Sequence, residues 1–184
     1  MKIAVMGSHG TGKSTLVYQM TDQAKQRFRG LDIRVLLEVA RECPFPINEE
    51  GTEAAQRWIF GRQVVREVEL GSGHLLVCDR TVLDSLAYSE YRGFSRWVAS
   101  ALPLSVEWFR ERYHRVYFLR PAFAPAADGF RSTDPKFQSA IDAILLKWID
   151  RYKLRVIEAT PAQALIDFLD WFEMEGECAN PPRN

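Results

Sequence analysis

A glycine-rich segment near the amino terminus constrains the fold more than any other part of the chain. The apolar run of residues 3–6 is followed directly by Gly7-Ser8-His9-Gly10-Thr11-Gly12-Lys13-Ser14-Thr15, and a helical pattern begins inside this segment. Two glycines separated by four residues and followed by Lys and Ser or Thr form the pattern of a phosphate-binding loop. Because the pattern has a strand before it and a helix after it, we expect an anion site rather than a loop that only joins a strand to a helix.

Each residue type in this loop has a physical task in binding a phosphate. Gly7, Gly10 and Gly12 allow positive φ and close backbone approach, so that successive N–H groups can point at one anion. The helix that begins near Lys13 adds the positive end of its dipole. We expect Lys13 to reach the β- and γ-phosphates of ATP and to act in catalysis, and Ser14 to bind Mg²⁺. The His9 side chain can be an exposed position without a role, but its backbone belongs to the expected nucleotide-binding residues, which are Gly7, Ser8, His9, Gly10, Thr11, Gly12, Lys13, Ser14 and Thr15.

The charge balance argues against a protein that binds nucleic acid. The 184 residues include 24 Lys and Arg and 24 Asp and Glu, so the formal net charge is zero, whereas nucleic-acid-binding proteins usually carry a basic excess. With 47% hydrophobic and 26% charged residues, the chain has the composition of a globular domain.

The three cysteines form no CxxC pair, which favours a reducing, cytoplasmic compartment over a structural zinc site. We expect neither a membrane-spanning segment nor a signal peptide, because no apolar stretch is long enough and the first strand begins at residue 2.

Short apolar runs alternate with segments of helical periodicity along the chain. Strands are expected at residues 3–6, 33–37, 75–78, 116–119 and 155–157. Helices are expected at residues 13–28 and 52–70, after a cap at Thr81, within 95–113, and from Asp134 and Thr160 onward. Pro103 predicts a break that divides 95–113 into two helical pieces. The alternation predicts one α/β domain over residues 1–174, with a parallel sheet between two layers of helices and a flexible tail at 175–184.

Functional residue types follow the ends of several expected strands. Gly7, Glu38, Asp79 and Arg120 each fall at or just after such an end. Ligands of an open parallel sheet bind beyond the carboxyl ends of its strands. We therefore expect the glycine-rich loop, one or two carboxylates and several arginines to converge on one crevice.

Two carboxylates in this set are candidates for the chemistry of phosphoryl transfer. Asp79 can hold Mg²⁺ directly or through water, or bind substrate, and its simpler alternative is an acid at a helix amino terminus. Glu38 can accept the proton of an attacking hydroxyl, and its simpler alternative is an ion pair with Arg41 or Arg80. We therefore expect both carboxylates to be catalytic.

The remaining candidates bind substrate or cover the nucleotide. Arg41 and Arg80 can bind a substrate phosphate or the transferring group, or can be structural ion-pair residues. Asp84, one turn after Arg80, can orient that arginine or contact a sugar hydroxyl. Arg120 and Arg131 flank a loop of lid-like length, and a mobile lid can bring arginines over the phosphates and exclude water. We expect Arg120 to contact the nucleotide and Arg131 to act in catalysis from the lid.

Together these motifs resemble those of the P-loop nucleoside and nucleotide kinases. The residues that carry the resemblance are the loop at 7–15, Glu38-Val39-Ala40-Arg41, Asp79-Arg80-x-x-x-Asp84 with Tyr88, and Asp128-Gly129-Phe130-Arg131. Within this superfamily the chain is similar to AAA-labelled ATPase and kinase domains related to nicotinamide riboside kinase. The resemblance implies a P-loop NTPase three-layer sandwich, with a five-stranded parallel sheet of order 2-3-1-4-5 and an arginine-bearing lid.

The resemblance also bears on the roles of individual residues. In deoxynucleoside kinases a Glu-x-x-Ala-Arg signature after the second strand carries the catalytic base, and an acid–arginine pair follows the third strand. Here the first signature is one residue shorter, from Glu38 to Arg41, and the acid of the pair is Asp79, as in thymidylate kinases.

We therefore expect an ATP- and Mg²⁺-dependent kinase that phosphorylates a nucleoside-like, nucleotide or other small acceptor. One alternative is an ATP-dependent regulatory ATPase or switch that acts through a protein partner. A GTP-dependent switch is disfavoured because no Asn-Lys-x-Asp motif is present. A third hypothesis is a polynucleotide-end kinase, against which the neutral charge argues. The sequence also leaves open a homodimer.

Overall fold

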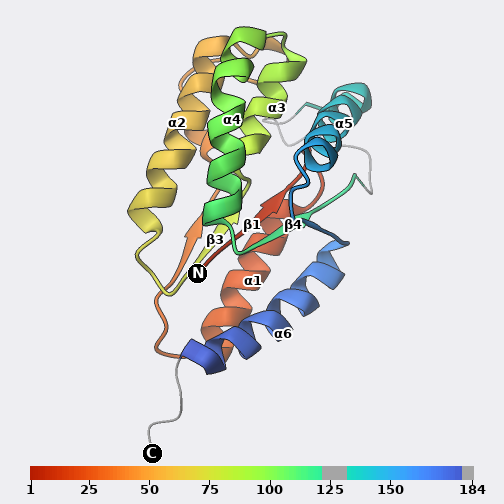
Figure 1. Cartoon of the computed structure of the whole chain (residues 1–184). Helices are drawn as coiled ribbons and strands as arrows, with labels where there is room; N and C mark the ends of the chain where they lie inside the picture. The colour runs from red at the N-terminus through yellow and green to blue at the C-terminus, as the bar shows by residue number, and fades with distance from the viewer. Residues whose placement is uncertain (122–131, 180–184) are drawn as a thin grey trace, which may run out of the picture.

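The computed structural model describes residues 1–121 and 132–179, and its centre is a parallel β-sheet (Figure 1). The strands are β1 (Lys2–Met6), β2 (Ile33–Leu36), β3 (Leu75–Asp79), β4 (Arg115–Phe118) and β5 (Ile157–Glu158). Their order is β2-β3-β1-β4-β5, and every neighbouring pair is parallel. The predicted order 2-3-1-4-5 is thereby confirmed.

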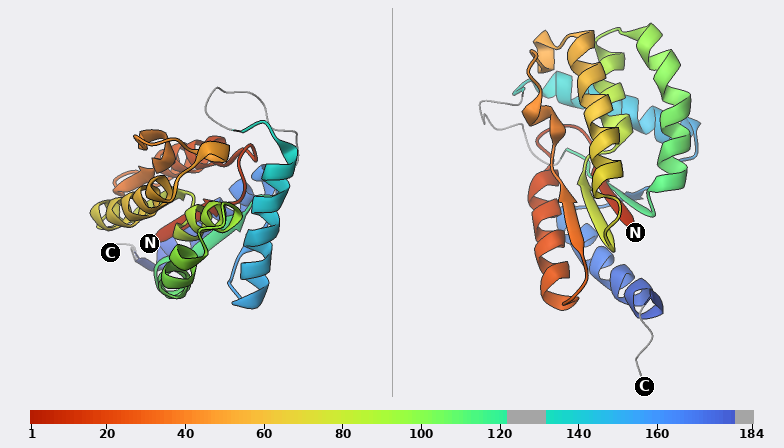
Figure 2. Two further views of the ribbon diagram at one scale, coloured as in Figure 1. Left: turned by 90° about the horizontal axis from the view of Figure 1, so that it is seen from above. Right: turned by 90° about the vertical axis from the view of Figure 1, so that its left-hand side faces the viewer.

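Helices cover both faces of this sheet, as Figure 1 and Figure 2 show, which confirms the three-layer sandwich. One face is covered by α1 (Lys13–Arg27) and α6 (Pro161–Ala179). The other face is covered by α2 (Glu53–Leu70), α3 (Val82–Tyr91), α4 (Ser95–Arg112) and α5 (Pro135–Arg151). Two short 3-10 helices, η1 (Val39–Glu42) and η2 (Asn48–Glu50), lie between β2 and α2. The segment that contains them, residues 39–50, lies beside the amino-terminal part of α2 (Figure 2).

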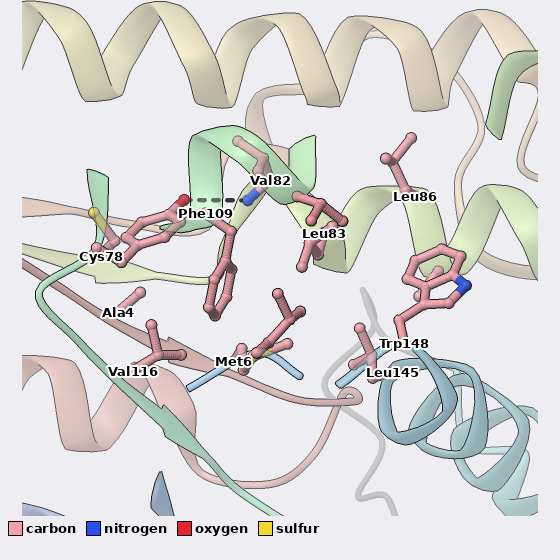
Figure 3. Close-up of a cluster of buried hydrophobic side chains, with 14 of the residues drawn as sticks. Ala4, Met6, Cys78, Val82, Leu83, Leu86, Phe109, Val116, Leu145 and Trp148 are labelled. Carbon is pink, nitrogen blue, oxygen red and sulfur yellow. Dashed lines mark hydrogen bonds between the residues drawn. The ribbon is translucent and has the colours of Figure 1, made fainter. Parts of the chain in front are cut away.

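Alternating side chains of β1 join the central strand to both layers of helices. Ile3 and Val5 pack with the α1 and α6 side chains, whereas Ala4 and Met6 pack in the other cluster, and all four are fully buried. Figure 3 shows this second cluster, in which Ala4 and Met6 lie on the same side of the sheet as Phe109 of α4. Full burial of one large apolar side chain contributes roughly 1.5–3 kcal/mol, so these contacts anchor β1 between the two layers.

The strand register places the ends of three strands at one edge of the sheet. Val5 pairs with Asp79, and Leu36 pairs with Cys78, which directly precedes Asp79. Met6 pairs with Phe118 on the other side of β1. The residues that follow β1, β2 and β3 therefore leave the sheet close together.

Side-chain caps fix the starts of three helices. Thr52 accepts a hydrogen bond from the backbone N–H of Ala55 at 3.1 Å, and Asp134 accepts one from Lys136 at 2.8 Å. Thr81, the expected cap of α3, forms a capping box with Asp84. The Thr81 side chain accepts from the backbone of the first turn of α3, and the Asp84 side chain accepts from the backbone N–H of Thr81. Caps of this kind contribute about 1 kcal/mol each and set where the helix begins.

The predicted break at Pro103 is wrong, because α4 is one continuous helix from Ser95 to Arg112. Pro103 and Ala99 are both exposed, so the carbonyl that loses its intrahelical donor can bond to water instead. The opposite side of the helix is buried through Val98, Leu102 and Phe109. Tertiary packing on that side outweighs the local penalty of the proline.

We predict that Pro103→Ala raises the free energy of unfolding by about 1–2 kcal/mol. The substitution restores a helix hydrogen bond and removes a residue whose helix propensity is about 3 kcal/mol less favourable than that of Ala. It also makes the unfolded chain more flexible, which lowers the free energy of unfolding by about 1 kcal/mol. Urea denaturation measures the change. Leu104→Ala is the control, because Leu104 is exposed on the same turn and its loss should matter little. An unchanged or reduced stability of Pro103→Ala would show that the proline does not strain α4.

The carboxyl-terminal region is helical further than expected. Helix α6 continues to Ala179, so the first five residues of the expected tail at 175–184 belong to a helix, and residues 180–184 lie outside the described part. None of the helices in the described ranges is both long and apolar enough to cross a membrane.

Candidate functional site

The glycine-rich loop between β1 and α1 has the backbone that its sequence predicts. Gly7, Gly10 and Gly12 have φ angles of 138°, 73° and 84°, a region that other residues rarely adopt. Helix α1 begins at Lys13 directly after Gly12. The loop therefore presents its backbone N–H groups and the positive end of α1 around one centre, as a phosphate cradle requires.

Lys13 lies folded over this loop and is almost completely buried. Its Nζ donates to the backbone oxygen of Ser8 and, at 3.2 Å, to Oγ1 of Thr11. Burial lowers the pKa of Lys13 to about 7, with a further contribution from the neighbouring charge of Arg80. The carboxylates of Asp79, Asp84 and Glu38 oppose this shift without cancelling it. The protein alone thus compensates the buried positive charge of Lys13 only in part, and an anion in the loop would stabilise this charge.

We predict that nucleotide binding takes up a proton at pH 8. With a pKa of about 7, Lys13 is mostly neutral at this pH, and a polyphosphate favours its charged form and raises its pKa. We expect an uptake of about 0.9 proton per ADP, because a group one unit below the pH is about 90% neutral. Calorimetric titrations in buffers of different ionisation enthalpy measure this number.

A control for this prediction is the exposed lysine Lys153, which is paired with Asp150 at the end of α5. Lys153→Ala should leave the proton uptake unchanged. Binding of ADP without proton uptake at pH 8 would contradict a neutral Lys13 in the ligand-free loop.

Ser14 and Asp79 form a pair that fits a magnesium ion. Ser14 Oγ donates to Oδ2 of Asp79 at 2.6 Å, and the other carboxylate oxygen of Asp79 is buried with no hydrogen-bond partner among the described residues. Burial raises the pKa of Asp79, and the charges of Lys13 and Arg80 oppose this shift. The described residues contain no cluster of three or more acidic, His or Cys side chains that could hold a metal alone. Mg²⁺ usually takes one or two protein ligands and completes its shell with water and phosphate oxygens.

Glu38 and Arg80 form a buried ion pair between the ends of β2 and β3. Oε1 of Glu38 accepts from Nε of Arg80 at 2.6 Å and from its Nη2 at 2.5 Å. Arg41 approaches Oε2 of Glu38 at 3.6 Å, so both ion-pair partners considered from the sequence are present. Burial alone would lower the pKa of Arg80, but the negative groups around it, with Glu38 first, hold it well above its usual value. Arg80 is therefore charged throughout the physiological range, and it fixes the Glu38 carboxylate beside the loop.

The backbone of Arg80 adopts a conformation that non-glycine residues rarely show, with φ at 87°. Such a conformation costs about 1–3 kcal/mol and is retained where the surrounding contacts determine it. Here the Arg80 N–H donates to the oxygen of Val5, and its carbonyl accepts from the side-chain amide of Gln63. These two contacts turn the guanidinium toward Glu38 and the loop.

Asp84 is fully buried and contacts the first residue of the loop. Its Oδ1 accepts from the N–H of Gly7 at 3.1 Å and lies 3.6 Å from Nη1 of Arg80. Its Oδ2 accepts from both the N–H and the hydroxyl of Thr81 at 2.8 Å. Of the two roles considered from the sequence, this geometry favours the orienting role over contact with a sugar hydroxyl.

The remaining expected residues are three arginines. Arg41 is half exposed at the start of the 39–50 segment. Arg120, at the end of β4, donates from Nε to Asp142 at 2.9 Å and from Nη1 to Glu158 at 3.4 Å. Arg131 and its Asp-Gly motif lie outside the described residues, so the arginine lid stays a prediction.

His9 is not an exposed position, contrary to one of the two expectations. It is 2% exposed, and its ring lies 5.2 Å from the ring of Phe137. Its Nδ1 is 3.2 Å from the hydroxyl of Tyr88, and its backbone oxygen accepts from the amide of Gln138 at 2.7 Å. The third residue of the loop is thus fixed by α3 and α5.

A pocket opens beside the loop between the 39–50 segment, α2 and α3. Glu38 and Arg80 line it at the loop end together with His9. Most of the remaining wall is apolar and includes Val39, Ala40, Ile47 and Ile59. In this structure the cavity measures about 40 Å³, which is room for a few water molecules.

The pocket also contains two buried glutamines that were not predicted from the sequence. Gln56 and Gln63 of α2 are 3% and 2% exposed and line the pocket. Their spacing of seven residues places them on one face of a helix, and this is the local signal that could have indicated them. Glutamine on a helix is usually solvent-exposed, so the pattern has little weight without the fold.

The strand order and the glycine-rich loop are those of a kinase-like P-loop fold. A family model described as "AAA domain" matches residues 2–164, so the chain belongs to this family. A search of curated proteins finds no match to this chain.

Three solved structures share the fold. Deoxyadenosine kinase from M. mycoides, with the products dCMP and dCDP bound, is 12% identical with a TM-score of 0.62, covering 98% of this chain and all of that one. Thymidylate kinase from Ehrlichia chaffeensis is 14% identical with a TM-score of 0.67, covering 92% and 98% of the two chains. NadR in complex with NR is 20% identical with a TM-score of 0.69, covering 91% of this chain and 50% of NadR. The expected fold of the P-loop nucleotide kinases is thereby confirmed.

We predict that Gly7→Ala lowers the free energy of unfolding by about 1–3 kcal/mol and weakens ADP binding. A Cβ at Gly7 would lie 2.5 Å from the backbone oxygen of Leu119, and the φ of 138° disfavours any side chain. Denaturation and calorimetric titration measure the two effects. The control is Gly61→Ala on α2, where nothing lies within 4 Å and helix propensity favours alanine. Equal effects of the two substitutions would contradict a special backbone requirement at Gly7.

Proposed function

We propose that this protein is an ATP- and Mg²⁺-dependent kinase that transfers the γ-phosphoryl group to a nucleoside-like, nucleotide or other small acceptor. The observation that carries the proposal is the position of Glu38. This carboxylate lines a largely apolar pocket that opens directly beside the phosphate loop. A nucleotide-binding site needs only the loop, whereas a kinase also needs a place for an acceptor next to a proton acceptor.

Each charged group has a role in this mechanism. The loop and Lys13 would bind the β- and γ-phosphates, and Arg80 would bind the transferring group or an acceptor phosphate. Ser14 and Asp79 would hold Mg²⁺, which supplies charge neutralisation on the phosphates. Asp84 positions Arg80 and the amide of Gly7, so it acts through these groups and not on the substrate.

The transfer step conserves atoms and charge. The acceptor hydroxyl oxygen forms a bond to the γ-phosphorus while the bond from that phosphorus to the β-bridging oxygen breaks. The hydroxyl proton passes to Glu38, and ADP leaves with the bridging oxygen. When the attacking group is a phosphate oxygen, there is no hydroxyl proton to remove. Glu38 therefore contributes most when the substrate attacks through a hydroxyl.

The 39–50 segment is the part of the pocket wall that an acceptor would displace. The cavity of about 40 Å³ has room for only a few water molecules, and Val39, Ala40, Ile47 and Asn48 of this segment line it. This segment is held at its end by Arg92, whose Nε donates to the oxygen of Gly51 at 3.2 Å. We infer that acceptor binding displaces this segment and that its return excludes water from the transfer.

The test of this function is a transfer assay with purified protein, ATP, Mg²⁺ and a panel of nucleosides and nucleotides. Mass spectrometry should detect an acceptor with one added phosphoryl group. Slow release of ADP with every member of the panel, and no phosphorylated acceptor, would contradict the kinase and favour an ATP-dependent regulatory protein.

We predict that Lys13→Ala abolishes transfer without unfolding the protein, and that Glu38→Gln lowers kcat by about 10²–10⁴. ATP affinity of Glu38→Gln should change no more than about threefold, since Glu38 lies on the acceptor side. Steady-state kinetics and binding of a fluorescent ADP analogue separate the two effects.

The matched control for Glu38 is Glu42→Gln, because Glu42 belongs to the same segment and pairs with Arg62 at the surface. It should keep both kcat and ATP affinity. If ATP affinity of Glu38→Gln falls as far as kcat, Glu38 is not the proton acceptor for the acceptor hydroxyl.

A further inference from the structure

Asp142 is a buried carboxylate that the proposed transfer mechanism does not use. Its side chain, on α5, is 7% exposed, and its Oδ2 pairs with Nε of Arg120 at 2.9 Å. The other oxygen, Oδ1, is buried and has no hydrogen-bond partner among the described residues. Burial raises the pKa of Asp142, and the charge of Arg120 opposes this shift. A buried carboxylate with an unpaired oxygen is costly, so the pair with Arg120 satisfies Asp142 only in part.

Arg120 is shared between two carboxylates and is not enclosed by them. Its Nη1 also approaches Oε1 of Glu158 at 3.4 Å, and the Glu158 side chain is 58% exposed. The Arg120 side chain is itself 47% exposed. An arginine that serves only to join two elements is expected to bind both oxygens of one carboxylate with its forked guanidinium. The observed contacts use one oxygen of each carboxylate, so Arg120 can leave them at a small cost.

The position of Arg120 brings this pair next to the phosphate loop. Arg120 follows β4, which lies beside β1 in the sheet (Figure 1). A Cβ at Gly7 would lie 2.5 Å from the backbone oxygen of Leu119, so the chain that leads to Arg120 runs in contact with the loop. After the charge of Arg120, that of Lys13 also opposes the rise in the pKa of Asp142 that burial causes. The pair is therefore within electrostatic reach of the loop lysine.

Asp142 belongs to the helix that contacts the loop directly. Gln138 lies one turn before Asp142 on α5, and its amide donates to the backbone oxygen of His9 at 2.7 Å. This contact holds the part of α5 that carries Asp142 beside the loop. A carboxylate held next to an anion site competes with the anion for any cation that both can reach.

We propose, on the basis of nucleotide binding in the proposed function, that Asp142 is a positioning residue that keeps Arg120 away from the nucleotide. In the ligand-free protein Arg120 pairs with Asp142. A nucleoside diphosphate or triphosphate in the loop takes Arg120 from this pair and binds it through a phosphate group. Because the first pair must break, Asp142 holds the nucleotide affinity below the value that the loop and a released Arg120 would give.

The test compares Asp142→Asn with the unmodified protein in calorimetric titrations of the full chain with ADP and Mg²⁺. Asparagine keeps the shape of the side chain and removes its charge, so Arg120 is released. We expect ADP to bind about fivefold more tightly, which is the upper range for an ion pair with an exposed partner.

Arg120→Gln separates the release of Arg120 from a general effect of charge. Removing a negative charge near a bound polyphosphate favours binding even when no arginine moves. Arg120→Gln alone should weaken ADP binding. In the Arg120→Gln background, Asp142→Asn should change the ADP affinity by less than about twofold, because the two residues act through one pair.

The matched control is Asp167→Asn, because Asp167 pairs with Arg115 at the other end of β4 at 2.7 Å. This substitution removes the same charge from another aspartate–arginine pair of the same strand. It should leave the ADP affinity unchanged. Circular dichroism shows that each variant is folded.

The nuclear magnetic resonance signal of the Arg120 Nε–H group gives a readout that does not depend on affinity or on any substitution of Asp142. Its absence from the spectrum of Arg120→Gln assigns it. Adding ADP to the unmodified protein should shift this signal, because its carboxylate partner is exchanged for a phosphate. In Asp142→Asn the signal should already be shifted before ADP is added.

Three results would overturn the proposal: an ADP affinity of Asp142→Asn no higher than that of the unmodified protein, an equal gain in the Arg120→Gln background, or an Arg120 signal that ADP does not shift. Each of them leaves the proposed kinase untouched, because phosphoryl transfer is measured separately with the acceptor panel. Failure of the unmodified protein to bind ADP would overturn this proposal together with the proposed function.

Discussion

The peptide group of Gly7 is the contact on which the site depends, because buried charges hold both of its polar atoms. Its N–H donates to Asp84, and its carbonyl accepts from Nη1 of Arg80 at 3.4 Å. Arg80 in turn binds Glu38, so the ends of β1, β2 and β3 and the start of α3 meet at one glycine. Removing Arg80 would take the same ion-pair partner from both Glu38 and Asp84, which is strongly destabilising. The shape of the phosphate loop is therefore set by the protein before a nucleotide arrives.

The elements that were predicted correctly are those with local physical signals. The loop sequence itself requires positive φ at its glycines, and Thr81 and Asp134 begin helices because their side chains bond to nearby N–H groups. Apolar runs identified the strands, and the sheet order came from the resemblance. The convergence of Glu38 and Asp79 followed from the rule that parallel strands end at one edge, and the pair with Arg80 had been named as an alternative.

The elements that were missed depend on contacts between distant parts of the chain. On α2, the apolar residues Val65 and Val68 are 48% and 63% exposed, whereas Gln63 and Glu67 are buried. Their burial depends on distant partners, because Lys2 pairs with Glu67, which also accepts hydrogen bonds from Trp108 and Tyr113. No periodicity within α2 contains this information. Likewise Pro103 is tolerated in α4 because it faces solvent, which is a property of the packed helix and not of its sequence.

The bond between Gln138 and the backbone oxygen of His9 has a consequence for how the molecule responds to its ligands. At 2.7 Å it ties the phosphate loop to the first turns of α5, and Phe137 packs on the His9 ring beside it. Any shift of the loop on binding must therefore carry α5 along or break this bond. Coupling between two sites is reciprocal. If one orientation of α5 raises nucleotide affinity by some factor, bound nucleotide shifts the equilibrium toward that orientation by the same factor. A ligand or partner that binds α5 would therefore change the affinity of the phosphate loop for nucleotide.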